Sequence, residues 1–190
     1  NNIYLCDEYY KLSTGVNLTP LLKPGSSERD PKIRPVGAGD LLSRMANRIA
    51  WSEVKDAVVR EVYPQQLGVG VKDGCSRVIH MANLISRAAS HPGPLQPLLE
   101  DWIIVSLDQT CAHNRYFRAD SQRLWDAKPE FKPLADLHRA TYSEKTVIKA
   151  KTRSGRYEHL ADSWDGGIQG DPLVPGSYCL VLNELLQKFE

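Results

Sequence analysis

The 190-residue sequence has few cysteines, no long apolar run and almost no net charge. Its four cysteines, Cys6, Cys75, Cys111 and Cys179, show no C-x-x-C spacing, which argues against a zinc knuckle and against a disulfide framework. The sequence lacks both a run of 18 apolar residues and a cationic leader followed by an apolar stretch, so it predicts neither a membrane span nor a signal peptide. Together these absences favour a globular protein of an intracellular, reducing compartment.

Hydrophobic residues make up 42% of the chain, which is enough for a core in one domain or in two small lobes. The formal charge of +1 hides two basic segments, at residues 23–34 and 145–156, and such local patches suit a polyanionic partner. The first residue is Asn1, and the helical pattern over residues 174–190 has no terminating Gly or Pro. We therefore expect a piece of a larger protein.

Local patterns predict most of the secondary structure. Residues 21–36 and 145–161 each place apolar edges around a turn-forming loop, which indicates two β-hairpins. Apolar residues recur at helical spacing over residues 40–62, with Asp40 as the N-cap. A second helix is expected over residues 73–89, and its predicted buried face consists of Val78, Met81, Ala82, Leu84 and Ile85. Further helices are predicted at residues 120–128, 132–142 and from 174 onward.

The aliphatic run at residues 103–107 predicts a strand buried on both faces, because neither Gly nor Pro interrupts it. Asp108 follows this run directly. A carboxylate at the end of a buried strand is poorly solvated unless a cation meets it, and in phosphate chemistry that cation is usually a divalent metal. Two interpretations of Asp108 stay open at this point: a metal ligand, or a cap of the next turn.

Arg34 stands directly before Pro35 in the first predicted hairpin. A proline forces extended geometry on the residue before it, which limits where the guanidinium of Arg34 can point. A planar, permanently charged group held in a strand suits a triphosphate. The alternative is a solvated hairpin with ordinary surface charges.

Four motifs occur in a characteristic order: K-I-R-P-V at residues 32–36, Q-L-G-V-G at 66–70, L-D-Q-T-C-A-H-N at 107–114 and Q-G-D-P at 169–172. This order resembles the fingers and palm of a reverse transcriptase, most closely of the non-LTR retrotransposon and group II intron type, from about residue 21 to the end. The resemblance implies an α+β fold with helices packed on a small, mainly antiparallel sheet. It also implies a fingers-like region at residues 1–100 and a partial palm at 101–190.

The resemblance implies a catalytic and metal-binding role for Asp108, which would hold Mg²⁺ or Mn²⁺ together with the backbone carbonyl of Gln109. Arg34, aided by Lys23 or Lys32, would neutralise the triphosphate of an incoming deoxynucleotide. These roles agree with the local interpretations of the strand and of the first hairpin.

Further roles are implied at the turn and at the glycine-rich loop. Backbone amides around Cys111 and Ala112 would cradle phosphate oxygens. Gln169 and Gly170 would line the site near the nucleotide and the template. His113 occupies the position of an aromatic residue that packs under the sugar in this family, where Phe or Tyr is usual.

The family's paired-Asp motif is absent from the 190 residues. Two-metal phosphoryl transfer needs several carboxylates, so we expect that this chain alone does not polymerise. One hypothesis is an RNA-directed DNA polymerase fragment. Another is a non-catalytic module that binds RNA or protein in a larger ribonucleoprotein such as a ribosome, and a third is the palm of a viral RNA-directed RNA polymerase. RNA is the expected partner of the first two, with deoxynucleotides added for the polymerase.

Overall fold

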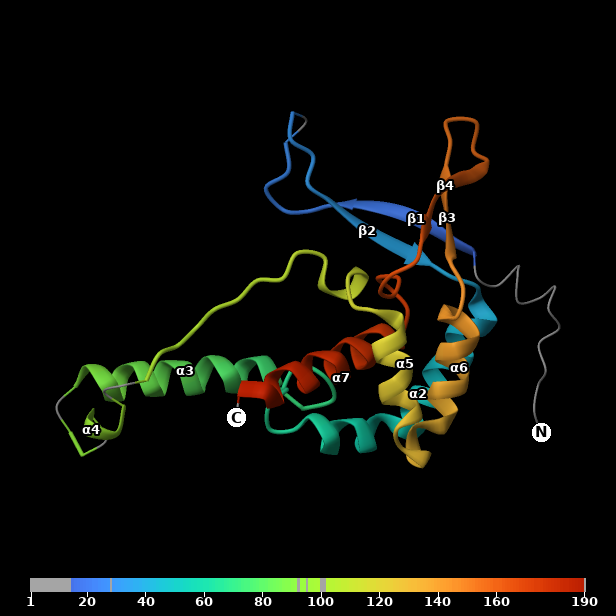
Figure 1. The fold of residues 1–190 in the computed structure, drawn as a ribbon. Helices are drawn as coiled ribbons and strands as arrows, with labels where there is room; N and C mark the ends of the chain where they lie inside the picture. Colours follow the sequence, from blue (N-terminus) through green and yellow to red (C-terminus); the bar gives the residue numbers. More distant parts are fainter. Residues whose placement is uncertain (1–14, 28, 92, 95, 100–101, 190) are drawn as a thin grey trace.

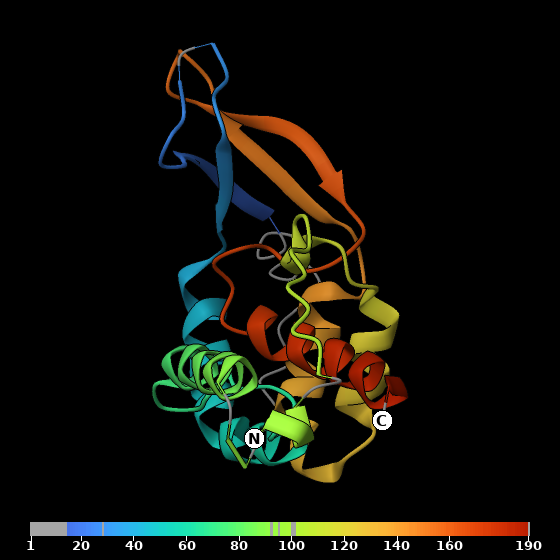
Figure 2. The same ribbon diagram turned by 90° about the vertical axis from the view of Figure 1, so that its left-hand side faces the viewer.

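The computed structural model describes residues 15–27, 29–91, 93–94, 96–99 and 102–189. The chain has an α+β fold in which most helices gather below a small twisted sheet (Figures 1 and 2). The predicted fold class is therefore confirmed at the level of its architecture. None of the described helices has the length and apolar character needed to cross a membrane.

The sheet contains four strands, β1 (Gly15–Leu22), β2 (Ile33–Ala38), β3 (Thr146–Lys151) and β4 (Tyr157–Ser163). Their order is β2-β1-β3-β4. The pairs β1–β2 and β3–β4 are antiparallel, which confirms both predicted hairpins, whereas β1 and β3 run parallel. The parallel pair joins strands from distant parts of the sequence, so each hairpin gains one covered edge.

The helices follow the predicted spans closely. Their bounds are α2 Leu41–Val62, α3 Gly74–Ser90, α4 Gln96–Leu99, α5 Arg118–Asp126, α6 Lys132–Tyr142 and α7 Val174–Leu186, with short 3₁₀ turns η1 Ala112–Asn114, η2 Pro129–Phe131 and η3 Gln187–Phe189. Asp40 caps α2 as predicted, because its carboxylate accepts a hydrogen bond of 2.9 Å from the amide of Ser43.

The main core lies between the second half of α2 and helices α5, α6 and α7, and we call this region the helical core. Its largest fully buried side chains include Val58, Val62, Trp125, Phe131 and Leu134. Trp125 and Phe131 meet edge to face with ring centroids 5.5 Å apart. Apolar burial of this kind supplies most of the folding free energy of such a domain.

The predicted buried face of α3 is wrong. Val78, Met81 and Leu84 are 51%, 56% and 67% exposed. The helix projects away from the helical core (Figure 1), and its main neighbour is the short α4. Its apolar periodicity is real, but the described residues place no second surface against that face.

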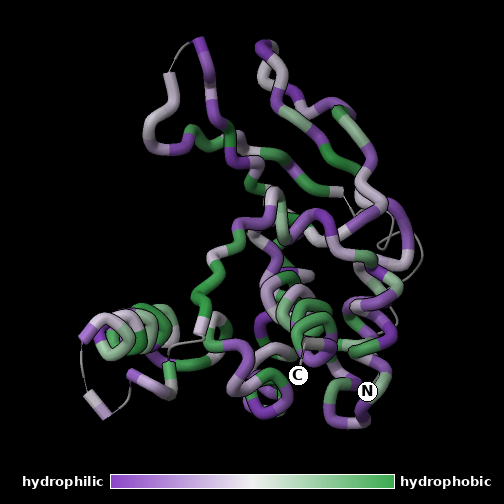
Figure 3. Tube along the Cα trace, turned by 60° about the vertical axis from the view of Figure 1, so that its left-hand side comes forward, coloured by the Kyte–Doolittle hydropathy of each residue, from purple (hydrophilic) through white to green (hydrophobic). Residues whose placement is uncertain are grey.

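The predicted buried strand at residues 103–107 is also wrong. The segment is extended and forms no strand pairing, and Ile103, Val105 and Leu107 are 84%, 68% and 90% exposed. A strand is buried only when a neighbouring strand pairs with its backbone and other elements cover its side chains, and the described part of the chain supplies neither. We call α3 and residues 102–107 together the exposed arm; its apolar character is visible in Figure 3.

Candidate functional site

An open cavity of about 370 Å³ lies between β2, the turn around η1 and the loop before α7. Its lining residues are Lys23, Ile33, Arg34, Pro35, Gln109, Cys111, Ala112, His113, Asn114 and Gln169. Seven of the residues singled out from the sequence therefore meet at one place, although they come from three separate segments. Lys32 and Asp108 do not line this cavity, and Gly170 lines the adjoining one.

The turn at Cys111 has a geometry suited to an anion. Cys111 adopts the left-handed conformation, with φ 55° and ψ 40°, and the right-handed 3₁₀ turn η1 follows it. Within the described chain, the amides of Cys111, Ala112 and His113 donate to no backbone carbonyl. Consecutive amides in such a left-then-right conformation point to a common side and form an anion-binding concavity.

The glycine-rich loop at residues 165–171 holds the turn at Cys111 in place through hydrogen bonds. The side chain of Asn114 donates a 2.8 Å hydrogen bond to the carbonyl of Gly167, and the amide of Gly167 donates to the carbonyl of His113, also at 2.8 Å. Gly166 has φ 55°, and a Cβ there would lie 2.3 Å from the carbonyl carbon of Asn114. A larger residue would push the loop away from the turn.

The same loop is also attached to the sheet. The amide of Gly37 in β2 donates a 2.9 Å hydrogen bond to the carbonyl of Gln169. Gly170 has φ 117°, and a Cβ at that position would lie 2.7 Å from the carbonyl oxygen of Gly37. The close contact explains the glycine of Q-G-D-P and holds Gln169 beside the strand that carries Arg34.

The carboxylate of Asp171 is fully engaged in hydrogen bonds that connect several elements of the fold. It accepts hydrogen bonds from the Tyr142 hydroxyl at 2.5 Å, from the Asn47 amide at 3.1 Å and from the Leu173 backbone amide at 2.9 Å. Burial raises the pKa of the Asp171 carboxyl, although these hydrogen bonds act in the opposite direction. One carboxylate thus ties α2, α6 and the start of α7 together.

His113 and Gln109 are positioned by α7. The ring of Tyr178 meets the ring of His113 edge to face, with centroids 5.5 Å apart. The Tyr178 hydroxyl donates a 2.7 Å hydrogen bond to the side-chain oxygen of Gln109. His113 lines both this cavity and the adjoining one, so its imidazole stands at the boundary between them.

The described residues do not complete the predicted metal site. Asp108 is exposed, and no group of three or more His, Cys, Asp or Glu side chains in the described part of the chain is arranged to hold a metal ion. Mg²⁺ and Mn²⁺ prefer several oxygen ligands. Asp108 can supply one of them, beside the cavity that its neighbour Gln109 lines.

The Q-L-G-V-G motif does not reach the cavity. Gln66 is buried near α7, where the Cys179 thiol lies 3.9 Å from its side-chain oxygen. Gly70 has φ 74°, and a Cβ there would lie 2.3 Å from the side chain of Val59 in α2. Gly68 faces open space. The glycine at position 70 therefore serves the packing of the chain after α2.

Arg118 is a residue that the sequence interpretation missed. Its buried guanidinium donates to the carbonyls of Gly166 at 2.8 Å and Glu144 at 2.6 Å, and to the Thr146 hydroxyl at 3.1 Å. It also lies 4.9 Å from the centre of the Tyr142 ring. Burial lowers the pKa of Arg118. The three hydrogen bonds of its guanidinium anchor both the glycine-rich loop and the start of β3.

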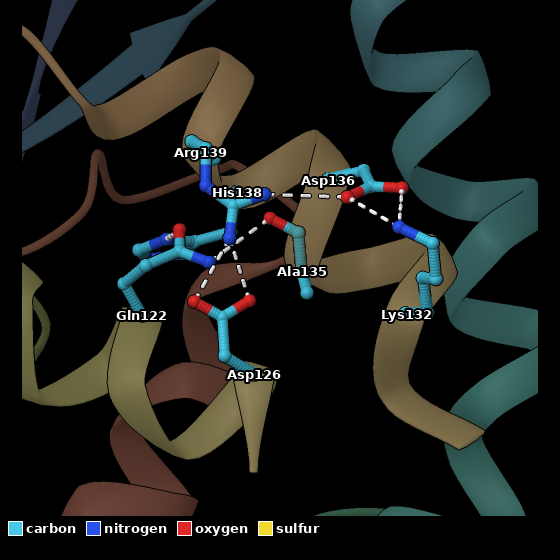
Figure 4. Close-up of polar contacts among 7 residues, drawn as sticks. All are labelled: Gln122, Asp126, Lys132, Ala135, Asp136, His138 and Arg139. Atoms are coloured by element: carbon cyan, nitrogen blue, oxygen red, sulfur yellow. Dashed lines mark hydrogen bonds and ion pairs between the residues drawn. The ribbon is translucent and has the colours of Figure 1, made fainter. Parts of the chain in front are cut away.

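A second missed cluster joins α5 to α6 (Figure 4). The ring of His138 has partners on both nitrogens, the Ser121 hydroxyl at 2.8 Å and the Gln122 side-chain oxygen at 2.9 Å. Burial, with the Arg118 charge as a further cause, lowers the pKa of His138 to about 4. Ser121 is fully buried, so no substrate reaches its hydroxyl and the cluster serves helix packing.

Comparisons with known proteins give no identity. No protein-family model matches the sequence. No curated protein matches it either. The motifs and the geometry of the cavity therefore carry the functional argument.

Proposed function

We propose that this chain is the nucleotide-binding and template-binding part of a reverse-transcriptase-like domain, which holds a deoxynucleoside triphosphate for RNA-directed DNA synthesis. The observation that carries the proposal is the convergence of Arg34, Lys23 and the free amides of the Cys111 turn on one cavity. Two cations and a set of aligned amides match the charge and the oxygen atoms of a triphosphate.

Each residue has a distinct part in this proposal. Arg34 and Lys23 neutralise the phosphate charge, and the backbone amides at residues 111–113 donate hydrogen bonds to phosphate oxygens. His113 packs under the sugar, and Gln169 lines the cavity near the base and the template. Mg²⁺ or Mn²⁺ would accompany the triphosphate, with Asp108 as one oxygen ligand.

Calorimetric titration of the 190-residue chain with a deoxynucleoside triphosphate and Mg²⁺ tests the proposal. Arg34→Gln should weaken binding by about tenfold or more, because a charge-assisted hydrogen bond contributes about 1.5–3 kcal/mol. Arg60→Gln is the matched control, since Arg60 lies in the last turn of α2, does not line the cavity and pairs with Glu130 at 4.0 Å. No binding by the wild-type chain, or equal weakening by both variants, would contradict the proposal.

A second candidate is a non-catalytic module that binds RNA or protein within a larger ribonucleoprotein. Two observations favour it: Asp108 belongs to no group of three or more potential metal ligands in the described residues, and the exposed arm offers apolar surface to a neighbour. The calorimetric titration with a deoxynucleoside triphosphate and Mg²⁺ separates the two candidates, because only the first one binds nucleotide. We expect the chain to bind nucleotide with Mg²⁺ without extending a primer. Primer extension by the chain alone would show that its own carboxylates suffice for polymerisation.

A further inference from the structure

A second hollow, of about 340 Å³, adjoins the nucleotide cavity. The two share His113 and Gln169. The hollow is also lined by Arg44 and Arg48 from the first half of α2 and by Gly170. A chain-like ligand that passes through the hollow would therefore lie next to whatever fills the nucleotide cavity.

Arg44 and Arg48 form a matched pair of cations. They are four residues apart on α2, so they project from the same face of the helix, and both are exposed. Neither forms an ion pair within 4 Å with a carboxylate of the described residues, whereas Arg123 and Arg139 do.

The carboxylate that lines this hollow, Asp171, forms no ion pair within 4 Å with either arginine. Asp171 already accepts hydrogen bonds from Tyr142, Asn47 and the amide of Leu173. Burial raises the pKa of the Asp171 carboxyl, although these hydrogen bonds and the charge of Arg44 act in the opposite direction. The hollow consequently presents two guanidinium groups to an anionic ligand that can reach both of them.

We propose that Arg44 and Arg48 bind two phosphates of the single RNA strand that serves as template. The inference rests on the proposed function, and it adds a second binding surface to the nucleotide cavity. Two guanidinium groups on successive turns suit a ligand that carries repeated phosphates, because each forms charge-assisted hydrogen bonds to one of them. The shared wall of His113 and Gln169 places the bound strand beside the nucleotide with which it would pair.

Salt-dependent RNA binding tests the inference on the full 190-residue chain. Fluorescence anisotropy with a short labelled single-stranded RNA gives the slope of log affinity against log salt for each variant. Arg44→Gln/Arg48→Gln should reduce that slope by about 1.4, because each lost phosphate contact on a single strand removes about 0.7. Over the tenfold range from about 1 M to about 0.1 M salt, this change corresponds to about 25-fold weaker binding at the lower concentration.

Two further variants make the result specific. Arg60→Gln/Lys132→Gln removes the same charge from the opposite end of α2 and the start of α6, so it should leave the slope close to that of the wild type. Arg44→Lys/Arg48→Lys keeps both charges and should keep the slope as well. Thermal denaturation of each variant checks that the exposed substitutions leave the fold intact.

The outcomes separate this inference from the proposed function. An unchanged slope in Arg44→Gln/Arg48→Gln, with nucleotide binding intact, overturns the inference alone. Equal slope changes in that variant and in Arg60→Gln/Lys132→Gln would also overturn it, because the effect would then be one of net charge. A wild-type chain that binds RNA but no nucleotide contradicts the proposed function instead.

Discussion

The helical core and the exposed arm contain similar apolar sequences but differ in how many other segments meet them. Helix α6 has its apolar face against α2 and α5 and buries Leu134 fully. Helix α3 has a comparable apolar face, yet Leu84 on it is 67% exposed. A periodic apolar pattern therefore specifies an apolar face, whereas burial of that face requires another segment of the chain to pack against it.

The largest expected effect comes from one substitution made in both regions. Leu134→Ala should lower the free energy of unfolding by about 3 kcal/mol, because it removes buried methyl groups and leaves a cavity. Leu84→Ala should change it by less than about 0.5 kcal/mol. Urea denaturation of the two variants measures both values. A loss of more than about 1.5 kcal/mol in Leu84→Ala would mean that the face of α3 is covered in solution.

Local sequence signals were sufficient for the elements themselves. The Asp40 cap, the helix periods and the turn residues of both hairpins act within a few residues, so they predict α2 and the β1–β2 and β3–β4 pairs. The predicted burial of residues 103–107 and of α3 was wrong because burial depends on distant segments. No local sequence pattern predicts which segment will pack against an apolar face.

The candidate site also combines features that local sequence predicts with contacts between distant segments that it does not predict. The motif order brought Arg34, Cys111 and Gln169 to attention, and the structure places them around one cavity. The groups that hold this cavity together were missed, since Arg118 reaches Gly166 across 48 residues of sequence. A buried arginine that bonds to backbone carbonyls has no signature in the sequence of its partners.

Acid should weaken the helical core through His138, with a smaller effect than Leu134→Ala. The pKa of His138 is about 4 in the folded chain and about 6.5 in an unfolded one. The unfolded state therefore binds the proton first as the pH falls, so stability is full above about pH 6.5 and is lost between about 6.5 and 4. From about pH 7.5 to 5 the expected loss is about 2 kcal/mol.

Comparison with His138→Gln isolates this effect from other titrating groups. The unfolding free energy of the wild type minus that of His138→Gln should fall by about 2 kcal/mol over this range. His91→Gln is the control, because His91 is exposed and bonds only to the carbonyl of Arg87 among the described groups. A difference that stays constant with pH would show that burial does not keep His138 neutral in the folded chain.

The smallest expected effect concerns the ion pair between Arg139 and Asp126, which links α6 to α5 on the surface of the helical core (Figure 4). The guanidinium contacts both carboxylate oxygens, at 2.7 and 2.8 Å, but the two side chains are 51% and 43% exposed. An exposed pair gains little Coulomb energy and loses side-chain freedom. A double-mutant cycle with Arg139→Ala and Asp126→Ala should therefore give a coupling free energy of about 0.5 kcal/mol, decreasing with salt. A coupling above about 2 kcal/mol that resists salt would mean that polar ties, and not apolar burial alone, distinguish the helical core from the exposed arm.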